Sequence, residues 1–464
     1  MPKNTSRGNS PSTEVDPSEE PAAVPRSRIA VASMIGTAIE FYDFYIYGTA
    51  AALIFGPLFF PTFSPTAGTL AAFATFAAGF VARPIGAILF GHWGDRIGRK
   101  NMLIASLLLM GISTVAIGLI PSYNSVGVLA PALLVTCRFL QGIGLGGEWG
   151  GAVLLATEYA PEGKRGLYSS FPQLGPAIGF IAANGLFLVM GATMSRSSFN
   201  SWGWRIPFLL SSILVAVGYV IRIGIAETPV FKAAAANAEN RPKIPFLELL
   251  RRQPVVLALS TVSFILAHTI FYTVTTFALA YGTATLKLSR EPLLICTMIA
   301  ALTLGIATPV LAVYSDRIGR RKVCLAATIA AVVWAFPLFA MINSLNYVLI
   351  AVGMSVGLAI FAGIYAPMGA YLPELFETRY RYSGAAFAYS ASGIVGGGVS
   401  PLLATAWVAN TGSSWPVSTY LAVIAALSFV CLLFLRETKD RSLSFADAPA
   451  SAASGAASPA PAGG

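Results

Sequence analysis

Charged residues, histidines and cysteines are all scarce in this sequence. Only 11% of its 464 residues are Asp, Glu, Lys or Arg, whereas a soluble globular protein carries about 25%. The two histidines, His92 and His268, lie far apart, and the four cysteines show neither metal-ligand nor disulfide spacing. We therefore expect no metal site, no cofactor and no enzyme built on a nucleophile and a base.

Apolar residues, in contrast, make up 56% of the chain, and its mean hydropathy is +0.71. Apolar runs of about 20 residues recur along it, and each is long enough to cross a hydrocarbon layer of about 30 Å as a helix. The sequence therefore predicts an all-α membrane protein with twelve transmembrane helices. The expected helices span residues 29–55, 67–90, 102–120, 128–158, 167–191, 204–226, 254–282, 291–314, 323–341, 346–373, 384–410 and 416–436.

A short charged motif occurs twice and relates the two halves of the chain. Asp95-Arg-Ile-Gly-Arg99 returns as Asp316-Arg-Ile-Gly-Arg320, each time between two apolar runs. Such a repeat predicts two six-helix bundles flanked by tails that are too polar to form a core. The expected parts are a disordered tail at 1–28, a bundle at 29–226, a central loop at 227–253, a bundle at 254–436 and a disordered tail at 437–464.

The positive charges predict how the chain is oriented in the membrane. Most Lys and Arg residues lie in the loops that follow the even-numbered helices. This bias places those loops and both termini in the cytoplasm. Because the basic residues are spread between apolar runs, the net charge of +10 does not indicate a nucleic-acid partner. We expect the lipid bilayer to surround the helices.

Three carboxylates fall inside expected helices, where an ionisable residue costs about 2.5–3.5 kcal/mol on insertion scales. Glu40 and Asp43 are three residues apart, so both lie on one face of the first helix, near mid-membrane. Two neighbouring carboxylates repel each other, and we expect one of them to bind a proton. The alternative is a permanently charged pair held by arginines. Glu148 is the third candidate for proton coupling.

Two arginines lie at similar depths. We expect Arg138 to pair with Asp43 when that carboxyl is charged and to be released when it is protonated, because arginine itself stays protonated. The alternative is a static ion pair that specifies packing. Arg83 and Glu148 also lie at matching depths, which predicts a second pair.

Several other residues of the expected helices invite a structural or a functional interpretation. His268 and Tyr272 are four residues apart, so they can face a cavity together. The alternative for His268 is a hydrogen bond within the bundle, and Gln173 is ambiguous in the same way. The glycines Gly142, Gly146 and Gly150 recur every four residues, a spacing that lets helices approach closely in lipid.

Together these motifs give the chain a family resemblance. It resembles the major facilitator superfamily and, within it, the metabolite:proton symporters, which include carriers of shikimate, 2-oxoglutarate, citrate, and proline or betaine. The matching segments are Glu40-Phe-Tyr-Asp43-Phe, Phe80-Val-Ala-Arg83-Pro-Ile-Gly86, Gly91-His-Trp-Gly-Asp-Arg-Ile-Gly-Arg-Lys100, Arg138-Phe-Leu-Gln-Gly142, Gly146-Gly-Glu-Trp-Gly-Gly151 and Ser201-Trp-Gly-Trp-Arg-Ile-Pro-Phe208.

The resemblance implies a central cavity that opens alternately to each side, lined by the helices at 29–55, 128–158, 254–282 and 346–373. Arg138 matches an arginine of the related sugar porters, Asp43 lies near their proton-coupling aspartate, and Gln173 matches a glutamine that contacts substrate. Arg83, Arg138, Gln173, His268 and Tyr272 are the expected substrate-binding residues.

The repeated motif resembles the cytoplasmic latch of that family. The implied latch residues are Gly94, Asp95, Arg96 and Arg99 in the first copy and Asp316, Arg317 and Arg320 in the second. The second copy has Ser315 where the first has Gly94, so we expect the first copy to be the main latch.

The expected function is import of a small organic acid with protons across the bacterial inner membrane. The chain is expected to work as a monomer that uses the proton gradient and no cofactor. Alternatives are symport of a zwitterionic osmolyte such as proline or betaine, proton antiport that exports a metabolite or drug, and a transporter-like sensor.

Overall fold

The computed structural model is helical, without strands, in the part of the chain that it describes, residues 26–97, 99–223, 245–377 and 380–441. The elements of the first half are α1 (Arg26–Leu53), α2 (Phe55–Phe59), α3 (Pro65–Ile97), α4 (Arg99–Leu119), α5 (Tyr123–Val126), α6 (Leu129–Gly146), α7 (Glu148–Glu158), α8 (Arg165–Thr193), α9 (Arg196–Ser201), η1 (Gly203–Arg205) and α10 (Ile206–Ile223).

The second half contains a comparable set of long helices. Its elements are α12 (Pro245–Arg252), α13 (Pro254–Tyr272), η3 (Thr273–Phe277), α14 (Ala278–Ala280), η4 (Tyr281–Thr285), α15 (Arg290–Ile318), α16 (Arg320–Asn343), α17 (Tyr347–Leu375), α18 (Arg381–Gly393), η5 (Ile394–Val399), α19 (Ser400–Thr411) and α20 (Trp415–Phe434).

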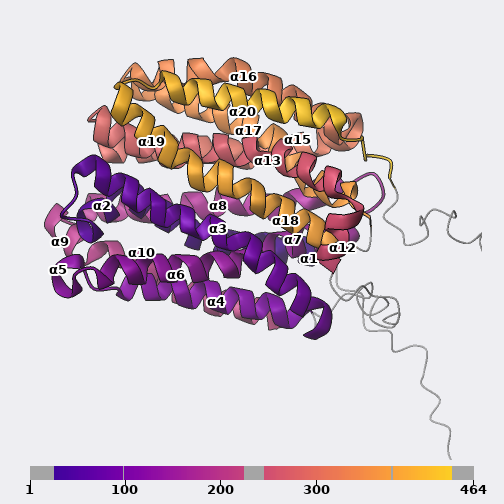
Figure 1. The fold of residues 1–464 in the computed structure, drawn as a ribbon, viewed down its shortest axis with the longest axis horizontal. Helices are drawn as coiled ribbons and strands as arrows, with labels where there is room; N and C mark the ends of the chain where they lie inside the picture. Colours follow the sequence, from indigo (N-terminus) through magenta and orange to yellow (C-terminus); the bar gives the residue numbers. More distant parts are fainter. Residues whose placement is uncertain (1–25, 98, 224–244, 378–379, 442–464) are drawn as a thin grey trace, which may run out of the picture.

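The long helices run side by side along the long axis of the molecule (Figure 1). The first half, in indigo and magenta, forms one layer, and the second half, in orange and yellow, lies against it. The short helices α2, α5 and α9 lie at one end and α12 at the other. Across the junction, α8 packs on α15 and α17, and α3 packs on α18, η5 and α19.

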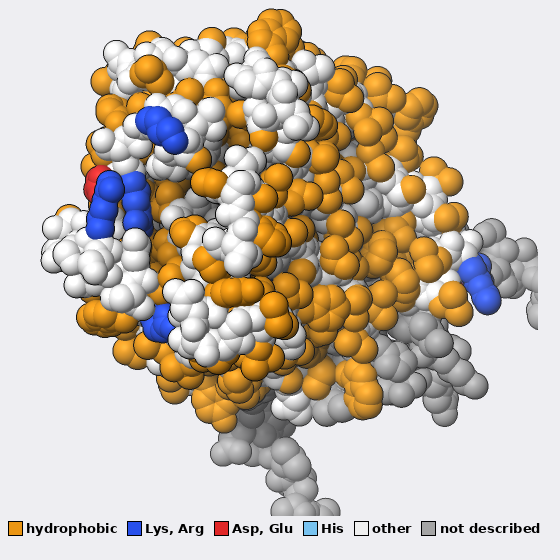
Figure 2. Space-filling view, turned by 60° about the vertical axis from the view of Figure 1, so that its left-hand side comes forward, with side chains coloured by type: hydrophobic (Ala, Val, Ile, Leu, Met, Phe, Trp, Pro, Cys, Tyr) orange, Lys and Arg blue, Asp and Glu red, His pale blue; other side chains and the backbone are white. Residues whose placement is uncertain are grey.

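Eleven helices in the described part of the chain are long and apolar enough to span a membrane. They include every expected helix except the first, which corresponds to α1 and carries Glu40 and Asp43. A count of twelve therefore stays a prediction. Figure 2 shows a surface dominated by hydrophobic side chains with few charges, as contact with lipid requires.

Three expected helices are less regular than the sequence indicates. The helix at 128–158 divides at Gly147 into α6 and α7. The helices at 254–282 and 384–410 contain π-helical turns, η3 and η4 in one and η5 in the other. Such wide turns occur often at functional sites, and no residue pattern in these runs predicted them.

Two segments that we assigned to the loop and a tail are ordered. Residues 245–252 of the expected loop form α12, whose Glu248 accepts a hydrogen bond from Tyr380. In the expected C-terminal tail, Glu437 and Thr438 make side-chain contacts described below. Residues 1–25, 224–244 and 442–464 lie outside the described part.

Glycines allow α3 and α6 to touch backbone to backbone. A Cβ atom at Gly142 would overlap the carbonyl oxygen of Gly79, and one at Gly146 would overlap that of Arg83. The close approach expected from the glycine spacing is therefore present between these two helices. It brings the helix that carries Arg83 against the one that carries Arg138.

This contact gives a first prediction. Gly146→Ala should lower the free energy of unfolding by about 1–3 kcal/mol, because the added methyl group has no space beside a backbone oxygen. The melting temperature of the purified protein in detergent measures the effect. Gly151→Ala is the matched control, since its Cβ would meet side chains at a comfortable 3.6 Å. Equal melting temperatures for the two variants would refute the close contact.

Candidate functional site

A small cavity lies between the two halves. The volume open to the centres of water-sized spheres is about 20 Å³, enough for about one water molecule. Its walls come from α1, α8, α13, α17 and α18, and aromatic rings make up most of them. The lining residues are Phe41, Tyr45, Pro176, Ala267, His268, Phe271, Tyr272, Phe361, Tyr365 and Tyr389.

The cavity wall agrees only in part with the resemblance. The helices at 29–55, 254–282 and 346–373 line it as α1, α13 and α17, but 128–158 contributes no lining residue. The reason is aromatic packing, because Phe44 and Phe76 contact both Arg138 on α6 and Tyr272 on the cavity wall. α8 and α18 complete the wall instead.

Two buried guanidinium groups lie beside these rings. The Arg83 carbon Cζ is 4.2 Å from the centre of the Phe44 ring, and that of Arg138 is 3.9 Å from the same centre. Arg138 also lies over Tyr47 and Phe76. Such contacts supply about 0.5–2 kcal/mol each, which replaces only part of the lost hydration.

Neither guanidinium has a carboxylate within 4 Å in the described part of the chain, and Nε and Nη2 of both lack a hydrogen-bond partner there. Arg83 also interacts electrostatically with His268, Tyr272 and Tyr389, which line the cavity. Unpaired buried cations next to a cavity form a site that suits an anion.

Asp43 lies in a pocket of hydroxyl groups, and it is completely buried. The Ser211 hydroxyl donates to its Oδ1 at 2.5 Å, and the Thr114 hydroxyl donates to its Oδ2 at 3.3 Å. The ion pair that we expected between Asp43 and Arg138 is therefore absent from this conformation. Arg138 instead donates from Nη1 to Oε1 of Gln141, a residue that the sequence analysis missed.

The second expected pair is not formed either. Glu148 accepts a hydrogen bond from Ser106 of α4 at 2.9 Å and makes no ion pair with Arg83 among the described residues. The two side chains point in different directions. Glu148 faces Ser106 of α4, whereas Arg83 faces Phe44, Phe80 and the cavity wall. Glu40 is likewise buried on α1.

Gln173 connects the two halves. Its amide oxygen accepts a bond from Trp149 at 3.0 Å, and its amide nitrogen donates to the carbonyl of Tyr365 on α17 at 2.6 Å. Trp149 in turn stacks on Tyr389, with ring centres 3.9 Å apart. In this conformation Gln173 stands behind the cavity wall and is engaged with protein partners at both amide atoms.

His268 and Tyr272 both face the cavity, as their spacing suggested. His268 Nδ1 lies 3.3 Å from the Ser392 hydroxyl, whereas its Nε2 is buried without a partner in the described part of the molecule. The Tyr365 hydroxyl is likewise buried without a geometric hydrogen-bond partner in the described residues. Both polar atoms belong to the second half, on α13 and α17.

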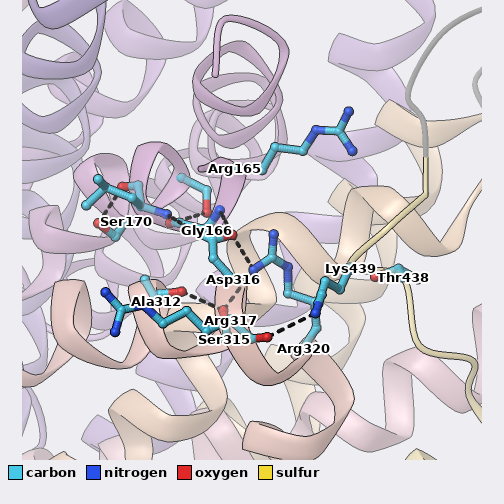
Figure 3. Close-up of polar contacts among 12 residues, drawn as sticks. Arg165, Gly166, Ser170, Ala312, Ser315, Asp316, Arg317, Arg320, Thr438 and Lys439 are labelled. Atoms are coloured by element: carbon cyan, nitrogen blue, oxygen red, sulfur yellow. Dashed lines mark hydrogen bonds and ion pairs between the residues drawn. The ribbon is translucent and has the colours of Figure 1, made fainter. Parts of the chain in front are cut away.

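The second copy of the repeated motif joins the halves at the end of the molecule where α8 begins (Figure 3). Asp316 accepts bonds from the backbone N–H groups of Gly166 and Leu167, at 2.8 and 2.9 Å. These are orphan donors at the start of α8, which has no cap of its own. Arg320 holds the same carboxylate at 2.5 Å.

A second carboxylate supports this junction from the C-terminal side. Glu374, which is buried, lies 3.6 Å from Arg320 and 4.0 Å from Arg165. Thr438 donates to it at 2.6 Å. Glu437 accepts bonds from the N–H groups of Arg320 and Arg321 at the start of α16. The sequence had predicted Arg320 as a latch residue, but it assigned no role in this junction to Glu374, Glu437 or Thr438.

The contacts described above belong to the second copy of the motif. The side chains of Gly94, Asp95, Arg96 and Arg99 fall outside the described residues. In the second copy, Arg317 offers its carbonyl oxygen to Lys439, 2.9 Å away. The expectation that the first copy forms the main latch stays a prediction.

Comparison with known proteins agrees with this architecture. Residues 29–244 match the model of the family described as "Sugar (and other) transporter", and residues 285–460 match that of the Major Facilitator Superfamily. The inner membrane metabolite transport protein YhjE of Escherichia coli is 47% identical, with 90% of this chain and 96% of the relative covered. The chain belongs to the major facilitator superfamily.

Other relatives of this transporter are named after different substrates. The shikimate transporter of Escherichia coli is 39% identical over 89% of this chain and 95% of its own. The proline/betaine transporter of the same species is 34% identical over 92% and 86%. Among solved structures, the proton:xylose symporter XylE bound to 6-bromo-6-deoxy-D-glucose has a TM-score of 0.71 and 18% identity, covering 90% of this chain and 97% of its own.

The Asp316 junction of the transporter gives a second prediction. Asp316→Ala should expose the seam between α8 and α17, because it removes two bonds to α8 and one ion pair. A reporter Ser169→Cys, in a background with the four native cysteines replaced by alanine, lies in that seam beside Gly369. Its labelling by a maleimide should rise several-fold.

The control is Glu162→Ala, which removes an exposed carboxylate from the loop before α8. It should leave labelling of the reporter unchanged. Equal labelling with and without Asp316 would show that this carboxylate does not hold the halves together.

Proposed function

We propose that the protein imports a small mono- or dicarboxylate together with protons across the bacterial inner membrane, as a monomer that uses the proton gradient and no cofactor. The observation that carries the proposal is the pair of buried guanidinium groups without carboxylate partners beside the central cavity. A substrate carboxylate supplies the missing negative charge, and Arg83 is the arginine closer to the cavity wall.

Asp43 supplies the proton-binding group in this proposal. Each hydroxyl that donates to it has a second acceptor at hand, the Met110 carbonyl at 2.9 Å for Thr114 and the Pro207 carbonyl at 3.5 Å for Ser211. A protonated Asp43 can therefore donate to one hydroxyl while that hydroxyl donates elsewhere. Both protonation states are satisfied without moving the backbone.

The arrangement of the contacts supports alternating access. The cavity between the halves is too small in this conformation for an organic acid. At the end where α8 begins, Asp316 and Glu374 hold the halves together. In the proposed cycle, an outward-open site binds proton and anion, the halves close as seen here, and the Asp316 contacts then break toward the cytoplasm. The positive-inside bias supports cytoplasmic termini.

The second candidate function is symport of a betaine-like zwitterion. The aromatic wall favours it, because tyrosine and phenylalanine faces attract quaternary ammonium groups. Arg83 would then hold the carboxylate of the same ligand. The proline/betaine transporter among the relatives agrees with this alternative as the shikimate transporter agrees with the first. Proton antiport is the third reading.

The direct test uses purified protein in liposomes that contain a pH dye. Shikimate, 2-oxoglutarate, citrate, aromatic acids, proline and betaine are added outside in turn. We expect one or more acids to acidify the interior through wild type and none through Asp43→Asn. Acidification by betaine alone would select the second candidate. Acidification that survives in Asp43→Asn would move proton binding to Glu40 or Glu148, and alkalinisation would indicate antiport.

A further prediction concerns Arg83, the proposed binding group for the substrate carboxylate. Arg83→Gln should reduce transport of the acid by about 100-fold or more, because loss of a charge-assisted bidentate contact costs roughly 3 kcal/mol in a buried site. Uptake of the radiolabelled acid measures this loss. Arg252→Gln, which alters an exposed arginine of α12, should transport normally. Normal uptake by Arg83→Gln would leave Arg138 as the substrate-binding arginine.

A further inference from the structure

Gln141 joins the two charged groups that the sequence analysis expected to touch each other. It lies on α6, one helical turn after Arg138, and is completely buried. Its Oε1 accepts from Arg138 Nη1 at 2.5 Å. Its Nε2 donates to Thr114 Oγ1 at 2.8 Å and to the main-chain oxygen of Asp43 at 3.1 Å.

The orientation of this amide is fixed by its neighbours. A guanidinium group only donates hydrogen bonds, and a main-chain carbonyl only accepts them. Turning the amide over would place its N–H groups against Arg138 and its oxygen against the carbonyl of Asp43. Gln141 therefore presents its oxygen to Arg138 and its N–H groups to Thr114 and Asp43.

The hydrogen bonds consequently run in one direction. Arg138 donates to Gln141, Gln141 donates to Thr114, and Thr114 donates to the Asp43 carboxyl. When Asp43 is protonated, its O–H can point at Thr114, whose hydrogen then turns to the Met110 carbonyl. Thr114 Oγ1 must then accept two bonds, from Asp43 and from Gln141. Both bonds can form, because a hydroxyl has two acceptor sites, but Thr114 is a weaker acceptor once it no longer donates to a carboxylate, so the bond from Gln141 weakens when Asp43 is protonated.

We propose that Gln141 and Thr114 are positioning residues that transmit the protonation state of Asp43 to Arg138. The inference rests on the proposed role of Asp43 as the proton-binding group. It replaces the expected direct ion pair by a relay through one amide and one hydroxyl. Arg138 is held by Gln141 alone among its hydrogen-bond partners in the described residues, so weakening that contact frees its guanidinium group.

Other groups around Asp43 act on it without entering the relay. The titratable or charged ones are Glu40 and Tyr42 on its own helix, Arg138 on α6 and Glu148 on α7. From the described residues of α4 and α10, the hydroxyls of Thr114 and Ser211 contact it. Tyr42 donates to the Pro207 carbonyl. Variants in the relay leave all four of these groups in place.

The test follows protonation of Asp43 by infrared spectroscopy of the purified full-length protein in lipid, without substrate. The carboxylic-acid band that disappears in Asp43→Asn reports this group, and its intensity is followed against pH. Thr114→Val should move the midpoint upward by about one pH unit, a tenfold gain in proton affinity, because a donor to the charged form is lost. Gln141→Leu should move it in the same direction.

Conservative variants separate this role from a structural one. Thr114→Ser keeps the hydroxyl and should titrate like wild type, whereas Thr114→Val removes it without changing the shape of the side chain. Ser113→Ala, which removes the neighbouring hydroxyl that bonds to Leu109, should also titrate like wild type. A melting temperature for each variant shows that the bundle is folded.

The outcomes distinguish the relay from the proposed function. Midpoints of Thr114→Val and Gln141→Leu equal to that of wild type would overturn the relay while leaving Asp43 as the proton site. An Asp43 band that does not change with pH in wild type would overturn the proton role and the relay with it. An upward shift in both variants, absent from Thr114→Ser and Ser113→Ala, supports the relay.

Discussion

The arrangement of the site depends on burying two guanidinium groups in aromatic surroundings, with no carboxylate of the described residues within 4 Å of either. An unpaired ion in a protein interior costs several kcal/mol, and ring contacts of about 0.5–2 kcal/mol each return only part of that cost. Arg83 and Arg138 both contact the Phe44 ring. The repulsion between their positive charges therefore adds to the free-energy cost of burying each of them. Neither cation has a carboxylate within 4 Å in the described part of the chain, and an anionic substrate can supply such a partner.

The sequence predicted the scale of the architecture better than its details. Long apolar runs, the repeated Asp-Arg-Ile-Gly-Arg motif and the four-residue glycine spacing rest on helix geometry and membrane thickness, which act locally. They led correctly to a helical membrane protein of the major facilitator superfamily. The π-helical turns in η3, η4 and η5 had no such local signal, because they depend on contacts between distant helices.

The charged residues were found, but their partners were not. Depth along a helix can be read from a sequence, and it suggested that Asp43 meets Arg138 and that Glu148 meets Arg83. The direction of a side chain around the helix, and what stands between two charges, cannot be read in the same way. Serine, threonine and glutamine are common in helices, so nothing marked Ser211, Thr114 or Gln141 as the neighbours of these charges.

The π-helical turns are distributed unevenly between the two halves. All three π-helical segments of the described chain belong to the second half, and two of them pack against the first half, η3 against α1 and η5 against α3. Asp43, Arg83 and Arg138 all belong to the first half, where α3 and α6 touch backbone to backbone. The two halves are alike in sequence pattern, but the buried Asp43, Arg83 and Arg138 belong to one half and the π-helical turns of the described residues to the other, so the exchange of proton and substrate and the irregular backbone are assigned to different halves.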